Sequence, residues 1–292
     1  MVIASSALIA IVPNFSKLAY ESGASVPLVI AGRFLVTVLL LVALLIVQGR
    51  SFVASARVLR LCLLGGIATA FMSFGVLSAI TRIDISLVIL IFYLHPMLIA
   101  WLGHLRGTYV LNRFRLLCCA LILIGLALAL SVDLERLDAW GVVLALVGTC
   151  GVTGLIVFNG EATRENGTLI VNFYTAAVAL VPACAAALLI GPLDVPQTGM
   201  GWFGLLSTGI FYCLGLALFF AGLRPIGMVR ATMITVIEPV LGILVAMLLF
   251  GERLSAVQWI GVAVVVAGLL LLEIPMDTAN RFFGAFRRSS RA

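Results

Sequence analysis

The side chains best suited to chemistry in this sequence are two titratable residues, each directly before a proline and deep in an apolar run. Glu238 precedes Pro239 within the run 228–250, and His95 precedes Pro96, 143 residues earlier (239 − 96). A charge in hydrocarbon is costly, and a proline removes a helical hydrogen bond and displaces a carbonyl. The spacing therefore predicts two interrupted membrane helices, each with an ionisable group near its centre. Such pairs are typical of a solute pathway through a membrane.

Each of the two groups has a functional and a structural interpretation. Glu238, with Thr235 one turn before it, either pairs with a cationic substrate or carries a proton, or else it only satisfies a freed backbone group or a neighbouring helix. An imidazole titrates near physiological pH, so His95 suits a proton relay or, alternatively, an interhelical hydrogen bond. Tyr93 lies in the same interrupted segment as His95.

Further polar and aromatic residues are expected along the same pathway. Asn14 follows Pro13, which opens backbone in the first helix, and it either binds polar substrate groups or joins two helices. Aromatic side chains around a few polar groups suit amphipathic small molecules, although contact with lipid or core is the commoner fate of one aromatic residue. The remaining pathway candidates are Asn172, Tyr174, Tyr212 and Phe74.

Two basic residues near the outer helix ends have two interpretations. Lys17 and Arg33 are long enough to reach the membrane interface as anchors, or they form a vestibule that attracts anions. No metal site or cofactor is expected, because the six cysteines lie in or beside apolar segments without a CxxC pair. The sequence also lacks HExxH, GxSxG and GxxxxGK motifs, so an enzyme is not expected and no residue is assigned as catalytic.

The composition excludes a water-soluble globule. Of 292 residues, 63% are hydrophobic and 10% are charged, and the mean hydropathy is +1.26. Soluble domains are about 45–50% apolar and about 25% charged. The net charge of +6 does not indicate a nucleic-acid partner, because the basic residues lie in short loops and a tail between apolar runs. The expected partners are the lipid bilayer and a small-molecule substrate.

The apolar runs predict an all-α membrane protein with ten transmembrane helices. A spanning helix needs about 20 apolar residues. The predicted spans are 2–20, 27–48, 58–80, 84–104, 113–131, 139–159, 168–190, 200–221, 228–250 and 254–273. With the N-terminus inside, thirteen arginines fall on the inner side and three, Arg82, Arg136 and Arg253, on the outer side. This asymmetry predicts cytoplasmic termini in a bacterial-type inner membrane, with a basic tail at 275–292.

The ten helices divide into two copies of one unit. Aligning Pro96 with Pro239 also aligns Gly125 with Gly268, without a gap. Each copy has five helices, an odd number, so the second copy must enter the membrane upside down. We therefore expect inverted repeats at 1–135 and 136–274.

The closing helices carry a resemblance to a known family. The residues that carry it are Glu238-Pro239, the run LLFGERL at 248–254, Gly261, Gly268, Arg224-Pro225 and, in the first two helices, Asn14, Lys17, Pro27 and Arg33. This pattern resembles the EamA family of the drug/metabolite transporter superfamily. The resemblance implies ten helices in a five-plus-five inverted arrangement and movement of small metabolites, often outward, with amino acids or related compounds as the first expectation.

The sequence thus predicts a secondary transporter that works by alternating access. The expected substrates are small organic metabolites, with drugs as a further class, and proton coupling is one option for driving transport. A lipid-linked carrier or flippase of the same fold is the alternative. Either a monomer or a homodimer is compatible with the sequence.

Overall fold

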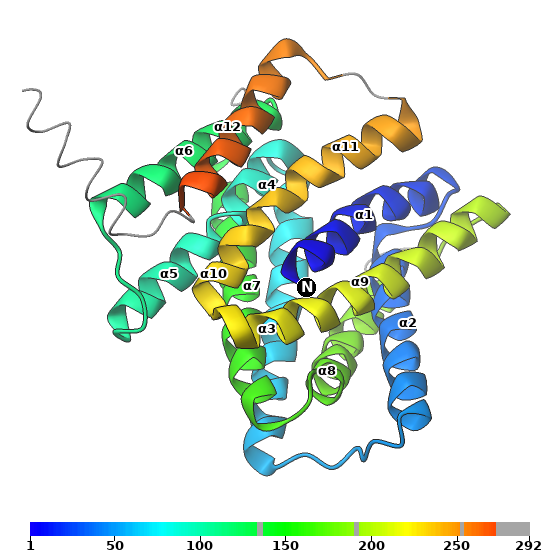
Figure 1. Cartoon of the computed structure of the whole chain (residues 1–292). Coiled ribbons are helices and arrows are strands. Elements are labelled where there is room, and N and C mark those ends of the chain that lie inside the picture. Colours follow the sequence, from blue (N-terminus) through cyan, green and yellow to red (C-terminus); the bar gives the residue numbers. More distant parts are fainter. Residues whose placement is uncertain (133–136, 190–192, 252–253, 273–292) are drawn as a thin grey trace, which may run out of the picture.

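The computed structural model describes residues 1–132, 137–189, 193–251 and 254–272, which are helical and contain no strand (Figure 1). The helices are α1 (Val2–Glu21), α2 (Val26–Val47), α3 (Ala56–Ile80), α4 (Ile85–Phe92), α5 (His95–Leu105), α6 (Arg113–Ala129), α7 (Ala139–Glu165), α8 (Thr168–Leu189), α9 (Gly199–Ile226), α10 (Met228–Ile234), α11 (Glu238–Phe250) and α12 (Ala256–Leu272), with a 3-10 turn η1 (Thr235–Ile237) between α10 and α11. The predicted tail 275–292 lies outside the described residues, as do Arg136 and Arg253.

Eight helical segments of the described chain are long and apolar enough to cross a membrane. They are α1, α2, α3, Ile85–Leu105, α7, α8, α9 and Met228–Leu249. Each overlaps a predicted span, and α7 and α9 extend beyond the predicted ends at 159 and 221. The predicted spans 113–131 and 254–273 correspond to the shorter helices α6 and α12, of 17 residues each. The protein is therefore an all-helical integral membrane protein.

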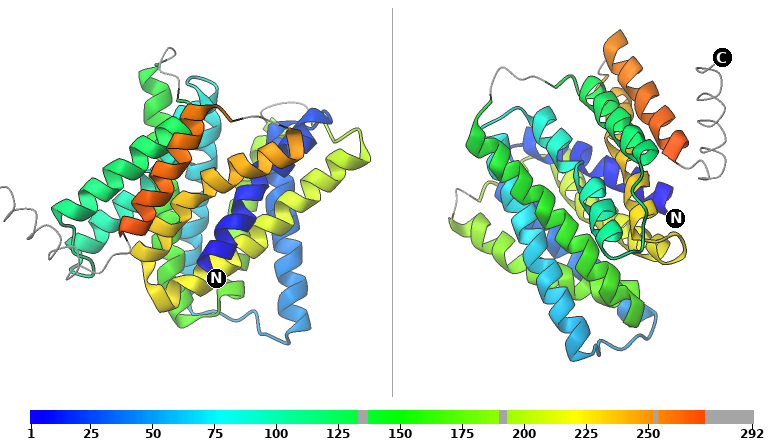
Figure 2. Two further views of the ribbon diagram at one scale, coloured as in Figure 1. Left: turned by 45° about the horizontal axis from the view of Figure 1, so that its top comes forward. Right: turned by 90° about the vertical axis from the view of Figure 1, so that its left-hand side faces the viewer.

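Four pairs of helices make the most extensive contacts: α3 with α7, α1 with α9, α6 with α12, and α2 with α8. Figure 2 shows α6 beside α12 and α3 beside α7 in views from different sides. Small residues allow this approach. A Cβ added to Gly75 of α3 would lie 2.5 Å from the backbone nitrogen of Gly148, and one added to Gly261 of α12 would lie 2.2 Å from that of Ala129. Without a hydrophobic driving force between helices in lipid, such backbone contact is a main source of association.

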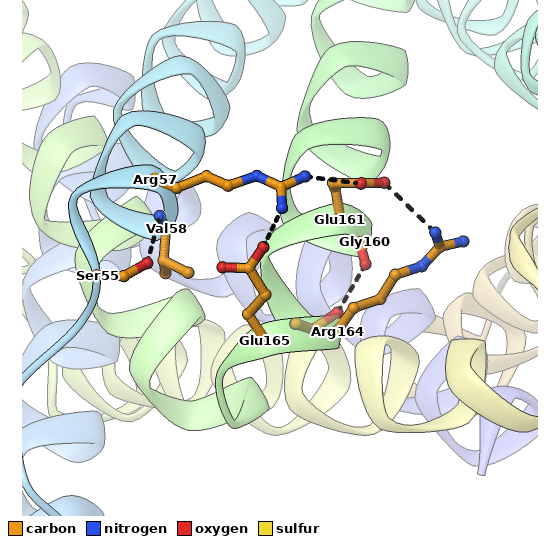
Figure 3. Close-up of polar contacts among 8 residues, drawn as sticks. Ser55, Arg57, Val58, Gly160, Glu161, Arg164 and Glu165 are labelled. Atoms are coloured by element: carbon orange, nitrogen blue, oxygen red, sulfur yellow. Dashed lines mark hydrogen bonds and ion pairs between the residues drawn. The ribbon is translucent and has the colours of Figure 1, made fainter.

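Ion pairs join α3 and α7 at both ends. Arg57 at the start of α3 contacts Glu161 and Glu165 near the end of α7 (Figure 3). At the opposite end, Arg82 contacts Asp138 at 3.1 Å, and this hydrogen bond lowers the pKa of Asp138. The predicted span 139–159 ends before the two glutamates, but α7 continues to Glu165, and both carboxylates pair with Arg57 beside the helix.

Candidate functional site

The first proline break separates α4 from α5 and is closed by a side chain. α4 ends at Phe92, and Pro96 is the second residue of α5. Proline has no N–H for the carbonyl four residues back, which here is that of Phe92. His95 Nδ1 lies 3.0 Å from this carbonyl oxygen. Because a carbonyl only accepts, Nδ1 carries the proton and donates. The buried imidazole thus replaces the missing backbone donor.

The second break, between α10 and α11, is closed by the backbone. α11 begins at Glu238, and Pro239 leaves the Thr235 carbonyl without its ordinary donor. The backbone N–H of Glu238 donates to that carbonyl through the turn η1. The Thr235 hydroxyl donates to the carbonyl of Thr232 at 2.8 Å, so it too is satisfied locally. The Glu238 side chain therefore remains available for contacts with other helices.

The Glu238 carboxylate joins the two breaks to α1. Tyr93, which caps the end of α4, donates its hydroxyl to Oε2 at 3.1 Å. Ser6 of α1 lies 3.4 Å from Oε1 and donates to it. Tyr93 and Ser6 are buried, and Tyr93 packs with Val236 and Val240 from the second break. We call Ser6, Tyr93 and Glu238 the carboxylate cluster.

The carboxylate cluster holds an acid without a basic partner. Both donors to Glu238 are neutral hydroxyls, and Glu238 makes no ion pair with any described residue. An unpaired charge inside a membrane is costly, so such a carboxylate is a group that a proton or a cationic ligand can neutralise. This is the chemistry of proton transfer or of cation binding.

Asn14 holds α1 beside the second break. Its Nδ2 donates to the Ala10 carbonyl at 3.2 Å and to the Gly242 carbonyl at 3.3 Å, one turn beyond Glu238 in α11. The expected interruption at Pro13 is absent, because α1 is helical from Val2 to Glu21. Packing along α9 and α11 holds α1 helical despite the lost hydrogen bond.

A second group of polar side chains surrounds a small cavity of about 10 Å³ between α2, α3, α7, α8 and α9. Asn172 and Thr175 of α8, Asn159 of α7 and Tyr212 of α9 line it, and all four are buried. The Thr175 hydroxyl donates to Asn159 Oδ1 at 2.9 Å. We call this cavity, which these four residues line, the amide cavity.

Of the two basic candidates, Arg33 lies beside the amide cavity. The Arg33 guanidinium carbon is 4.7 Å from the Tyr212 ring centroid and 5.0 Å from that of Phe34, so it stacks on aromatic faces next to the amide cavity. Lys17 is half-buried on α1.

Two predicted pathway residues lie elsewhere. The Tyr174 hydroxyl donates to the Phe52 carbonyl at 2.6 Å and so fastens the connection between α2 and α3. Phe74 is 58% exposed on the outer surface, because α3 turns its glycine face, including Gly75, toward α7.

The sequence analysis did not identify Ser6 or Asn159. Ser6 is a small residue in an apolar run and gave no positional signal. Asn159 was placed at the end of a predicted span, whereas α7 continues for six residues beyond it, to Glu165. An amide inside a long apolar helix was the signal that could have identified Asn159.

The comparisons with known proteins agree with this architecture. The model of the EamA-like transporter family matches residues 1–131 and, a second time, residues 139–274. An uncharacterized transporter of Archaeoglobus fulgidus is 28% identical over 67% of this chain and 69% of its own length. The uncharacterized transporter YwfM of Bacillus subtilis is 27% identical over 47% of each chain. A protein of known crystal structure shares the fold. Its TM-score is 0.76 at 20% identity, and the match covers 93% of this chain and 95% of that chain.

Proposed function

The chain belongs to the EamA-like transporter family, and on this premise we propose that it is a secondary transporter that moves small organic solutes by alternating access. The observation that carries the proposal is the meeting of the two proline breaks at the Tyr93–Glu238 hydrogen bond. Interrupted helices that meet around an ionisable group form the usual binding site of such transporters.

The proposed architecture is ten helices in two inverted repeats of five. The pairing of helices supports it. If α1, α2, α3, α4–α5 and α6 correspond in order to α7, α8, α9, α10–α11 and α12, the contact of α3 with α7 becomes that of α9 with α1. The contacts of α2 with α8 and of α6 with α12 map onto themselves. The family model also matches the chain twice, once in each half.

In this mechanism the carboxylate cluster joins elements that move relative to one another. Glu238 and Ser6 lie on α11 and α1, which pack together, whereas Tyr93 lies at the end of α4, which packs on α7. Rocking of one group against the other breaks the Tyr93–Glu238 hydrogen bond and hydrates the carboxylate from one side. The carboxylate then exchanges a proton or a cationic substrate group with that side.

The proposed substrates are small organic metabolites with an amino group, such as amino acids and related compounds, and drugs of similar chemistry. A carboxylate without a basic partner supports a cationic group in the substrate. We place the protein in a bacterial-type inner membrane with cytoplasmic termini, on the basis of its arginine asymmetry. A monomer or a homodimer, without a nucleic-acid partner, is the proposed form.

The test is solute flux into liposomes containing the purified protein, with and without an imposed pH gradient. Glu238→Gln keeps the shape of the side chain and removes its charge. We expect it to abolish gradient-driven flux while expression and the melting temperature are retained. Glu161→Gln is the matched control, because Glu161 lies in an exposed ion pair at the end of α7. Gradient-driven flux that survives Glu238→Gln would contradict the coupling role.

A panel of amines, amino acids, nucleosides and long-chain lipids in the same assay identifies the substrate class. Competition by water-soluble amines supports the proposal. Competition by long-chain lipids alone would indicate a flippase instead.

A further inference from the structure

We infer that the amide cavity is a separate binding site that takes an uncharged amide-type group of a small aromatic solute. The inference rests on the proposed function, because it assigns part of the transported molecule to this cavity. Its position is distinct from the carboxylate cluster: it lies between α2, α3, α7, α8 and α9, whereas Glu238 contacts α1 and the end of α4.

The cavity contains hydrogen-bonding atoms that have no partner. Asn172 is 4% exposed, and neither its Nδ2 nor its Oδ1 makes a hydrogen bond. Asn159 is fully buried, and its Nδ2 is also unpartnered, although its Oδ1 accepts from Thr175. Buried polar groups in proteins are nearly always paired, either with protein groups or with ordered water. Three unpartnered atoms on two residues that line one cavity therefore require an occupant that can hydrogen-bond with them.

The fold makes room for these amides. A Cβ added to Gly65 of α3 would lie 2.3 Å from Asn159 Oδ1, so the α3 backbone approaches the amide as closely as glycine allows. The hydroxyls of the three threonines that line the cavity already have acceptors: Thr37 donates to the Gly209 carbonyl, Thr69 to the Gly65 carbonyl and Thr175 to Asn159 Oδ1. The two asparagines are thus the side chains of this lining whose donors are shown to be unused.

The lining selects the chemistry of the ligand. Asn172 offers both a donor and an acceptor, the complement of a carboxamide. No charged side chain lines the cavity among the described residues, and Arg33 lies beside it over the faces of Phe34 and Tyr212. A charged group would therefore be buried without a direct counter-charge, which is costly. Phe34 and Tyr212, packed edge to face at 5.8 Å, supply an aromatic wall.

The cavity has a volume of about 10 Å³. It suits one water molecule, which is a competing occupant. A solute needs the cavity to widen, and this fits a site bordered by helices of both halves of the chain. The two occupants differ in one measurable respect: a structural water affects stability alone, whereas a binding site also controls affinity and ligand preference.

The experiment uses three probes of one shape, the neutral benzamide, the anionic benzoate and the cationic benzylamine, with the purified protein in lipid nanodiscs. Calorimetry gives the Kd of each probe. We expect benzamide to bind the wild type more tightly than benzoate does and to lose about tenfold in affinity with Asn172→Leu or Asn159→Leu, which corresponds to about 1.4 kcal/mol. Asn172→Asp should reverse the preference toward benzylamine. Asn166→Leu, at the end of α7 and outside the cavity, should leave the Kd unchanged.

Three results would overturn the inference: no benzamide binding to the wild type, tighter binding of benzoate than of benzamide, or Kd values for benzamide within twofold of the wild type after both asparagine changes. A lower melting temperature with an unchanged Kd would indicate a structural water only. Flux of benzamide into liposomes separates this inference from the proposed function. Asparagine-dependent binding without flux of any solute would contradict transport but leave the cavity site standing.

Discussion

The two proline breaks use the same backbone defect in opposite ways. In both, a proline deprives the carbonyl four residues back of its donor. At the first break the His95 side chain supplies the replacement, so its Nδ1 is bonded within the same interrupted segment. At the second break the Glu238 backbone N–H supplies it, and the carboxylate reaches Ser6 and Tyr93 on other helices. The repeated sequence pattern therefore does not imply a repeated role. The ionisable residue of the first break caps the backbone, whereas that of the second break contacts other helices.

The largest effect on stability is expected from removing the side chain that closes the first break. His95→Leu leaves the Phe92 carbonyl unsatisfied in the membrane interior, which should lower the free energy of unfolding by about 1–3 kcal/mol. Unfolding in denaturant or the melting temperature in detergent measures this. His95→Gln retains an N–H donor and should recover part of the loss. Equal stability of His95→Leu and the wild type would contradict the capping role.

An effect confined to transport is expected from Tyr93→Phe. This change keeps the ring in its core of Val236 and Val240 and removes only the donor to Glu238. A hydrogen bond to a charged group contributes about 1.5–3 kcal/mol, so gradient-driven flux should fall about tenfold or more. Phe92→Leu, which removes an adjacent ring without a hydroxyl, serves as the control for packing. Unchanged flux in Tyr93→Phe would show that the hydrogen bond between the two breaks does not contribute to transport.

The contact that holds α1 against the second break should contribute less. Asn14→Leu removes the hydrogen bond to the Gly242 carbonyl. Interhelical bonds of this kind in membranes average about 0.6 kcal/mol, which predicts a change of about threefold in flux. Pro13→Ala, at the neighbouring position, should have no comparable cost, because α1 is already continuous there. A tenfold loss in Asn14→Leu would point instead to direct contact of Asn14 with substrate.

The smallest effect is expected from the ion pair at the end of α3, which belongs to neither break. The Arg82 hydrogen bond lowers the pKa of Asp138 from its ordinary value of 3.8. Its stabilising contribution is therefore present above pH 3.8 and is lost as the pH falls through the lower folded-state pKa. Arg82→Gln should leave the pH profile of flux between pH 5 and 8 unchanged. A shifted profile would mean that a surface carboxylate, and not the second break, sets the response to pH.

The sequence and the structure agree most closely on the apolar segments. Length and hydropathy predicted spans that coincide with the eight long helices, because the bilayer fixes the length of any helix that crosses it. The helix boundaries were less predictable. The predicted span 139–159 ended before Glu161 and Glu165, whereas α7 includes both residues, which pair with Arg57. Pro13 suggested a break, but α1 remains helical because it packs along its neighbours.

What the sequence by itself determined was an all-helical membrane protein with interruptions near Pro96 and Pro239, since hydropathy and the missing proline N–H act locally. Only the tertiary structure decided which ionisable group is used within its own break and which reaches other helices. That choice depends on a tyrosine 145 residues from Glu238 and a serine 232 residues from it. It also decided that Asn159 and Asn172 face one cavity, because their convergence depends on how closely α3, α7 and α8 approach one another.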